Sequence, residues 1–146
     1  MVQILSPHTI ADWQAYYELR WRLLRAPWGQ PKGSERDEFE RSAFHVSAKN
    51  DSGVIVGVGR IHPLADEQWQ IRYMAVDEGY RNAGVGTMLL QALEDYARSR
   101  GAHQIVLNSR DTAVNFYTKH GYEIAGEAPT MFGVIDHKKL QKSLRF

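Results

Sequence analysis

The stretch that decides the fold is YRNAGVGTMLL, residues 80–90, where two glycines and an arginine lead directly into an apolar run. Residues 84–100 have apolar side chains at helical spacing and are followed by Gly101, a typical helix stop, so a helix is predicted here. The first turn of a helix has up to about four backbone N–H groups without partners, and the helix dipole adds positive charge there. Gly84 and Gly86 would let an anion approach these groups closely, and Arg81 would add a charged donor. The loop therefore suits a pyrophosphate, and a plain strand-to-helix turn is the alternative.

Common nucleotide-binding fingerprints are not met at this loop. Leu89 occupies the place of the third glycine in the dinucleotide fingerprint G-x-G-x-x-G, and the phosphate-loop lysine motif does not occur in the sequence. A nicotinamide cofactor and a phosphate-loop nucleotide site are therefore disfavoured.

The segments that flank the loop predict a strand–helix–strand unit. Residues 68–76 alternate in polarity, and residues 103–108 form a short apolar run, so each is expected to be a strand. Two strands joined by a helix imply a parallel pair with a right-handed crossover. On the first of these strands the alternation places four side chains on one side: Trp69, Ile71, Tyr73 and Ala75.

The other segments extend this unit into a larger sheet. Residues 44–49 and 54–62 are expected to form a hairpin around the turn NDSG, so the front of the sheet should be antiparallel. Further elements are expected as a strand at 2–5, helices at 9–25 and 111–121, and two final strands at 122–127 and 131–144; a short helix within 35–41 is a further option. We expect an α/β (mixed α+β) fold with a sheet of about six to seven strands, helices on both faces and a single domain over residues 1–146.

The first helix has an apolar stripe and a group of arginines. Thr9 or Asp12 is expected to cap this helix, and Asp111 or Thr112 the helix at 111–121. The expected buried stripe is Trp13, Tyr17, Trp21 and Leu24. A solvated face, rather than a ligand site, is expected for Arg20, Arg22 and Arg25.

Composition narrows the classes of function. The 146 residues include no cysteine, which excludes disulfides, thiolate metal sites and a cysteine nucleophile. A formal net charge of +1 gives no general attraction to nucleic acid or to an anionic membrane. The sequence has neither a secretory signal pattern nor an apolar run of membrane-spanning length, and its six histidines lack metal-binding spacing. We expect a cytoplasmic protein with no metal, no nucleic-acid partner and no membrane partner.

A second motif, NFYTKHGYE at residues 115–123, follows the glycine loop after about 35 residues. The two motifs together resemble the GNAT superfamily of N-acetyltransferases, over residues 54–124. Arg81, Gly84 and Gly86 match the first family signature, and the second is matched from Asn115 onward. The resemblance to a small, bacterial-type, single-domain member implies a GNAT-like fold whose sheet is splayed at the fourth strand.

The resemblance implies acetyl-CoA as co-substrate and a primary amine of a small molecule or protein as acceptor. Amides of residues 82–87 would hold the pyrophosphate, and the pantetheine arm would lie beside residues 74–76, where a main-chain N–H would stabilise the oxyanion. The acceptor site is expected between the first helix, residues 27–36 and the last strands. The implied coenzyme-binding residues are Met74, Ala75, Val76, Arg81, Asn82, Ala83, Gly84, Val85, Gly86, Thr87, Asn108, Asn115, Tyr117 and Lys119.

Catalytic roles also follow from the resemblance. Tyr117 matches the general acid that protonates the departing thiolate, with a core aromatic as the alternative. Many family members have a glutamate base on the strand at 68–76, but this strand has no carboxylate. His62 or His137 is the candidate base, and a structural histidine is the alternative for each.

Several alternatives stay open at this point. Glu123 and Asp136 are weaker candidates for the base, and a water relay would need no named base. Transfer is expected to be direct, through a ternary complex, because there is no cysteine to carry the acetyl group. The main rival function is an inactive coenzyme A-binding sensor or interaction protein of the same fold. A homodimer through the late strands is a further expectation.

Overall fold

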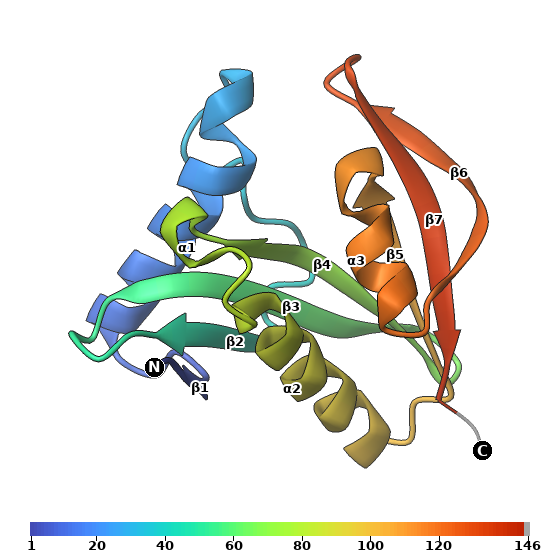
Figure 1. The fold of residues 1–146 in the computed structure, drawn as a ribbon, viewed down its shortest axis with the longest axis horizontal. Helices are drawn as coiled ribbons and strands as arrows, with labels where there is room; N and C mark the ends of the chain where they lie inside the picture. The colour runs from blue at the N-terminus through green and yellow to red at the C-terminus, as the bar shows by residue number, and fades with distance from the viewer. Residues whose placement is uncertain (145–146) are drawn as a thin grey trace.

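The computed structural model describes residues 1–144 as one seven-stranded sheet with helices on both faces (Figure 1). The strand order is β1-β2-β3-β4-β5-β7-β6. In chain order the elements are β1 (Gln3–Leu5), α1 (Ile10–Leu24), the 3₁₀ turn η1 (Ala26–Trp28), β2 (Phe44–Lys49), β3 (Ile55–Ala65), β4 (Gln68–Val76), η2 (Glu78–Tyr80), α2 (Val85–Ser99), β5 (Gln104–Arg110), η3 (Asp111–Ala113), α3 (Val114–Lys119), β6 (Glu123–Met131) and β7 (Ile135–Ser143). The predicted mixed α/β fold is confirmed.

The sheet opens between its two parallel strands. β4 and β5 pair only from Gln68 to Gln70, with Gln104 to Val106 as their partners, and the other neighbouring strands are antiparallel. Beyond Gln70 the two strands diverge, as Figure 1 shows. The predicted splay at the fourth strand is therefore confirmed, and it leaves one edge of β4 without a strand partner.

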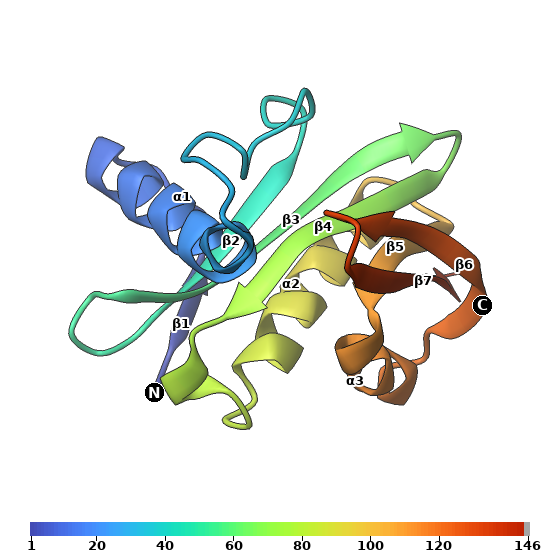
Figure 2. The ribbon, with the colours of Figure 1, turned by 90° about the horizontal axis from the view of Figure 1, so that it is seen from above.

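The helices cover opposite faces of the sheet (Figure 2). α2 buries Leu89 and Leu93 completely in the larger core cluster, whereas α1 packs on the other face through Tyr16 and Leu19. A Cβ added to Gly57 of β3 would lie 2.9 Å from Leu89 Cδ1. A glycine at this position therefore lets α2 approach the sheet closely.

The buried face of α1 differs from the predicted one. Trp13, Tyr17, Trp21 and Leu24 are only half-buried, and the buried side chains are Asp12, Tyr16, Leu19 and Arg20. Arg20 and Arg25 are 0% and 7% exposed, so the predicted solvated face is wrong for both, although Arg22 is exposed. The reason is tertiary: residues 30–43 pack over α1 and supply hydrogen-bond acceptors to the polar side of the helix.

A β-bulge interrupts the predicted alternation of β4. Val58 of β3 is opposite Ala75, but Arg60 is opposite Arg72, so Tyr73 and Met74 together face one residue of β3. Tyr73 has a φ of 60°, in the left-handed region. An extra residue sends the following side chains to the other face. Trp69 and Ile71 accordingly join the α2 cluster and Ala75 the α1 cluster, so the prediction that these side chains share one side is wrong.

The helix ends were predicted with mixed success. Thr9 caps α1, with its hydroxyl accepting from Asp12 N at 3.0 Å. Neither Asp111 nor Thr112 caps α3, because both lie in the 3₁₀ turn before it, and its N-cap Ala113 offers no side-chain acceptor. Residues 35–41 form turns rather than the short helix considered above. None of the helices described for residues 1–144 is both long and apolar enough to cross a bilayer.

Candidate active site

A cavity of about 1010 Å³ lies where β4 and β5 diverge. This volume is at the upper end of the range of about 300–1,000 Å³ that is common for ligand sites. Its walls are formed by β4, the end of β5, the glycine loop, α3 and the hairpin of β6 and β7. The splay of the sheet therefore creates a candidate ligand site.

The glycine loop places an uncapped helix end at this cavity. Gly84 is the N-cap of α2 and makes no side-chain cap, and the first bond of the helix runs from Met88 N to Gly84 O at 3.1 Å. The amides of residues 85–87 precede that bond, so they have no acceptor within the helix. They are available to an anion at the positive end of the helix dipole.

The two glycines of the loop have different roles. Gly84 has a φ of 81°, a left-handed conformation that side chains disfavour, while a Cβ there would meet no atom within 4 Å. Gly86 has ordinary helical geometry, but a Cβ there would lie 3.3 Å from the Phe116 ring of α3. Gly84 thus sets the conformation of the loop, and Gly86 permits α3 to pack against the first turn of α2.

Arg81 lies at the end of β4, beside the loop. Its Nε donates to Val76 O at 3.1 Å, which fixes the base of the guanidinium to the strand. Its side chain is exposed and lines the cavity. Its two terminal amino groups have no partner among residues 1–144, so they are available to a ligand.

Tyr117 of α3 is one of the residues that line the cavity. It is 7% exposed and packs in the core, and burial raises the pKa of its phenol well above the ordinary value. None of the hydrogen bonds among the described residues involves its hydroxyl. The hydroxyl therefore stays protonated and is available to a bound molecule.

His120 links α3 to the glycine loop, and the sequence patterns did not single it out. Its Nδ1 donates to Phe116 O at 2.8 Å, because a carbonyl can only accept. Nε2 of the neutral ring then accepts from Thr87 Oγ1 at 3.1 Å. This bridge connects the backbone of α3 at Phe116 to Thr87 in the first turn of α2.

The two candidate histidines lie in different surroundings. His137, on β7, is 6% exposed and lines the cavity. Its Nδ1 donates to Ile135 O at 2.9 Å, so Nε2 of the neutral ring carries the lone pair. His62 is fully buried outside the cavity, and its ring stacks on Phe39 at 4.2 Å between centroids. Burial and the charge of Arg60 lower the pKa of His62 to about 4.

The structure brings together ten of the fourteen predicted coenzyme-binding residues. The ten that line the cavity are Met74, Ala75, Val76, Arg81, Asn82, Gly84, Gly86, Thr87, Asn108 and Tyr117. Four do not line it: Ala83, Asn115 and Lys119 are exposed, and Val85 is buried in the core. Glu123 and Asp136 are also exposed and outside the lining.

Some lining residues were not predicted as site residues from the sequence. They come from distant segments, and the main ones are Arg25, Arg72, Tyr73, Arg110, Met131 and Phe132. Arg25 is the C-cap residue of α1, and the sequence marked it only as one of three neighbouring arginines for which a solvated face was expected. The others have no local pattern that marks them, because the fold alone brings them to the cavity.

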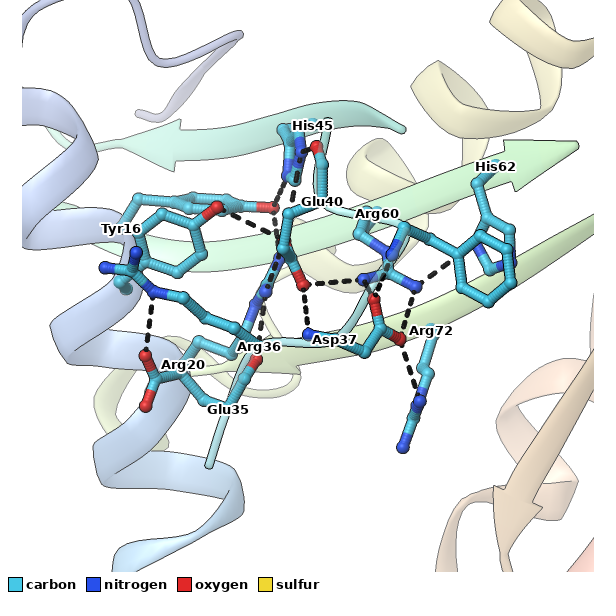
Figure 3. Close-up of polar contacts among 12 residues, drawn as sticks. Tyr16, Arg20, Glu35, Arg36, Asp37, Glu40, His45, Arg60, His62 and Arg72 are labelled. Carbon is cyan, nitrogen blue, oxygen red and sulfur yellow. Dashed lines mark hydrogen bonds and ion pairs between the residues drawn. The ribbon is translucent and has the colours of Figure 1, made fainter. Parts of the chain in front are cut away.

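A network of buried ion pairs adjoins the cavity and attaches residues 30–43 to the sheet (Figure 3). Arg60 of β3 donates to Asp37 at 2.6 and 3.0 Å and to Glu40 at 2.7 Å. Arg72 of β4 donates to Asp37 at 2.8 Å, and Arg20 of α1 to Glu40 at 2.9 Å. Burial alone would raise the pKa of Asp37, but the hydrogen bonds and charges of the arginines lower it to about 2.

Tyr73 lies between this network and the cavity. Its ring centroid is within 5.3 Å of four guanidinium carbons, those of Arg20, Arg25, Arg60 and Arg72. Such contacts stabilise a cation over the face of an aromatic ring. The bulge of β4 thus places one tyrosine where it holds cationic side chains at the wall of the cavity.

Comparisons with known proteins agree with this geometry. The family model described as "Acetyltransferase (GNAT) family" matches residues 13–122. The Bacillus subtilis protein named "Uncharacterized N-acetyltransferase YjcF" is 34% identical over 112 residues, which are 77% of this chain and 79% of that protein. A second B. subtilis protein, "Uncharacterized N-acetyltransferase YitI", is 25% identical over 135 residues, 88% of this chain and 90% of that protein.

Solved structures share the fold over nearly the whole chain. A putative N-acetyltransferase from Lactobacillus plantarum has a TM-score of 0.84 at 23% identity and covers 99% of both chains. An aminoglycoside 6′-N-acetyltransferase complexed with coenzyme A has a TM-score of 0.82 at 18% identity, covering 100% of this chain and 98% of that one. Because both sequence identities are below 25%, these comparisons show a shared fold only.

Proposed function

This chain belongs to the acetyltransferase (GNAT) family and is an acyltransferase, and from that premise we propose that it moves the acetyl group of acetyl-CoA directly to a primary amine of a small molecule or protein. One observation carries the proposal: a single cavity joins the uncapped N-terminus of α2, the open edge of β4 and the free hydroxyl of Tyr117. These three features are suited to a pyrophosphate, a pantetheine arm and a thiolate, respectively.

The coenzyme would lie along the opening of the sheet. The amides of residues 85–87 and the guanidinium of Arg81 would hold the pyrophosphate. Because β4 is paired with β5 only as far as Gln70, its later residues have unpaired main-chain groups that can bond the pantetheine. Asn82 and Asn108 line the same cavity, whereas Asn115 and Lys119 would contact the coenzyme only outside it. The coenzyme A complex of the aminoglycoside acetyltransferase of the same fold supports this choice of ligand.

The transfer would proceed by attack of the amine nitrogen on the acetyl carbonyl carbon. A main-chain N–H of residues 74–76 would stabilise the oxyanion that forms. As the C–S bond breaks, the phenol of Tyr117 would donate its proton to the sulfur. Free coenzyme A and the acetylated amine would then leave, and solvent would restore the proton of the tyrosine.

The amine must be neutral when it attacks, so a proton acceptor is needed. We assign this role to His137 Nε2, because the bond from Nδ1 to Ile135 O leaves Nε2 as the basic nitrogen in the cavity. Among the described residues, no aspartate or glutamate lines the cavity. His62 is not assigned, because it lies outside the cavity, and a water relay is the competing route.

The proposal is tested by measuring thiol release from acetyl-CoA with a panel of primary amines. We expect release well above the hydrolysis rate with at least one amine, and a higher melting temperature with acetyl-CoA but not with NAD or ATP. If acetyl-CoA binds and no amine accelerates release, the protein is a coenzyme A-binding protein instead, and direct transfer is rejected.

Three further proposals concern the whole chain. Residues 1–146 are proposed to form one domain, since all seven described strands belong to one sheet. A homodimer is proposed through the late strands, because β6 is an edge strand of the sheet, and light scattering tests it. A cytoplasmic location is proposed as well, and cell fractionation tests it.

A further inference from the structure

The charged side chains that line the cavity are all basic in the described part of the chain. Four arginines contribute, Arg25, Arg72, Arg81 and Arg110, together with the neutral or cationic ring of His137. No carboxylate side chain of residues 1–144 offsets them in the lining. Arg81 lies beside the glycine loop, where the coenzyme pyrophosphate would compensate its charge, so the other three need a separate explanation.

Arg25 is a buried cation whose polar partners are neutral. Its Nε donates to Ser34 O and its Nη1 to Leu24 O, both at 3.1 Å. Its guanidinium carbon lies 5.3 Å from the ring centroids of Tyr73 and Phe132. It forms no ion pair within residues 1–144, and burial lowers its pKa. The contact with Phe132 shows that this arginine lies where the end of α1 meets the β6–β7 hairpin; both are at the top of Figure 1.

Arg110 is the last residue of β5, and its guanidinium has no hydrogen-bond or ion-pair partner among the described residues. It is half-buried, lines the cavity and is opposite His137 in the register of β5 and β7. Burial, and then the charges of Arg25 and Arg81, lower its pKa, so the arginines repel one another. A partly buried charge without a partner is unfavourable, and a bound anion would reverse that cost.

Arg72 completes the group with a weaker contribution. Its Nη1 pairs with Asp37 at 2.8 Å, and its side chain is 40% exposed, so part of its charge is already compensated. We call the part of the cavity lined by Arg25, Arg72 and Arg110 its acceptor end. The uncompensated positive charge there is therefore carried mainly by Arg25 and Arg110.

We propose that the acceptor is a small primary amine that also carries an acidic group, a carboxylate or a phosphate, which Arg25 and Arg110 bind. This inference rests on the proposed function and specifies its acceptor class. A purely cationic amine would be repelled by three guanidinium groups, whereas an acidic group on the same molecule would be attracted. The same positive field disfavours the ammonium form, so it favours the neutral amine that the reaction needs in a cavity without a carboxylate base.

The test uses matched pairs of amines that differ in the acidic group. Calorimetry in the presence of coenzyme A would compare β-alanine with β-alaninamide, and phosphoethanolamine with ethanolamine, so the two pairs distinguish carboxylate from phosphate. We expect the acidic member of at least one pair to bind about 10-fold or more tightly than its neutral partner, as a charge-assisted contact provides. Arg110→Gln should remove most of this preference.

Two control variants make the result specific. Arg110→Lys keeps the positive charge, so it should retain part of the preference for the acidic amine. Arg81→Gln, at the coenzyme end, should weaken acetyl-CoA binding and leave the acid-to-neutral ratio unchanged. Melting curves of each variant establish that it is folded.

Each outcome decides the inference. Equal or undetectable binding of the acidic and neutral members to the wild-type protein would overturn it. The inference would also be overturned if the Arg110→Gln variant kept the preference for the acidic amine, or if this variant weakened the binding of acetyl-CoA alone. Acid-selective binding without thiol release would keep this inference and reject the proposed transferase reaction. Thiol release with equal kcat/KM for acidic and neutral amines would keep the transferase and overturn this inference.

Discussion

The acid and base proposed above are two side chains whose reactive atoms form no hydrogen bond among residues 1–144. No hydrogen bond among residues 1–144 involves the Tyr117 hydroxyl, and His137 uses Nδ1 on a backbone carbonyl, so Nε2 of the neutral ring keeps its lone pair; both residues line the cavity. Tyr122 and His62 are also buried, yet their polar atoms contact charged side chains outside the cavity. These neighbours therefore serve as matched controls.

Tyr117→Phe should lower kcat by about 100-fold while the KM for acetyl-CoA changes little, because only proton donation to the thiolate is lost. The melting temperature should hardly change, since no hydrogen bond among the described residues involves this hydroxyl. Steady-state kinetics and thermal unfolding measure the two effects. Tyr122→Phe is the control: it removes a buried 2.8 Å bond to Glu94, so it should lower stability and leave kcat near the wild-type value. Wild-type kcat in Tyr117→Phe would contradict the assignment of the acid.

His137→Gln should lower kcat by about 100-fold without raising the KM for acetyl-CoA, because glutamine cannot take the proton of the amine. His62→Gln should keep kcat and lose stability instead, since His62 is buried against Phe39 and outside the cavity. Kinetics of both variants at saturating acetyl-CoA make the comparison. The reverse pattern would assign the base to His62, and unchanged kcat in both would favour a water relay.

At the scale of elements, the N-terminus of α2 combines a fixed loop conformation with unsatisfied donors. Gly84 holds a φ of 81°, and the amides of residues 85–87 follow it without acceptors in the helix. Gly101, at the other end of the same helix, has a φ of 82° and equally open surroundings. A side chain at either position would therefore meet the same backbone strain, but Gly84 lines the cavity and Gly101 does not.

Gly84→Glu should weaken acetyl-CoA binding by about 100-fold, because a carboxylate would then occupy the site of the pyrophosphate. It should also destabilise the fold by about 1 kcal/mol through the left-handed backbone. Gly101→Glu should show a similar loss of stability and keep the affinity for acetyl-CoA. Calorimetric titration and chemical unfolding separate these effects, and unaltered affinity in Gly84→Glu would remove the pyrophosphate from this helix end.

At the scale of the whole molecule, a network of charges joins segments that are distant in the chain. Asp37 and Glu40, from the loop of residues 30–43, accept hydrogen bonds from Arg20, Arg60 and Arg72 on three different elements (Figure 3). Arg25 ties the same loop to the end of α1 through Ser34 O. This loop thus becomes part of the packed structure and supports the part of the cavity that Arg25 and Arg72 line.

Asp37→Asn should destabilise the protein by about 3 kcal/mol, because it removes one of the two carboxylates that pair with the buried guanidinium of Arg60 and leaves only Glu40. Urea unfolding at neutral pH measures this loss. Asp51→Asn is the matched control: Asp51 is 85% exposed and, among residues 1–144, its one ion pair is with the N-terminal amine, so the change should cost less than about 1 kcal/mol. Equal effects of the two variants would show that the network does not stabilise the fold.

The pH dependence of stability follows from the same carboxylate. The folded-state pKa of Asp37 is lowered to about 2, below the ordinary value of about 3.9, so its contribution is present above about pH 4. The contribution should be lost as the pH falls from about 4 through about 2, where the folded protein also takes up the proton. The difference in unfolding free energy between wild type and Asp37→Asn should shrink over this window, and a constant difference would contradict the lowered pKa.

The sequence by itself determined the order of the elements and the parallel pair of strands, β4 and β5, that α2 connects. It also determined that α2 begins at a glycine loop whose backbone N–H groups suit a phosphate. These features depend on neighbours within a few residues: alternation in β4, helical spacing after Gly84, and glycines at the ends of helices. The tertiary structure alone decided the buried face of α1, the bulge at Tyr73, that His137 and not His62 lines the cavity, and that Arg25, Arg72 and Arg110 line it too. Each of these depends on contacts between distant segments, as between Asp37 and Arg60 or Arg25 and Phe132, and no local pattern encodes such a contact.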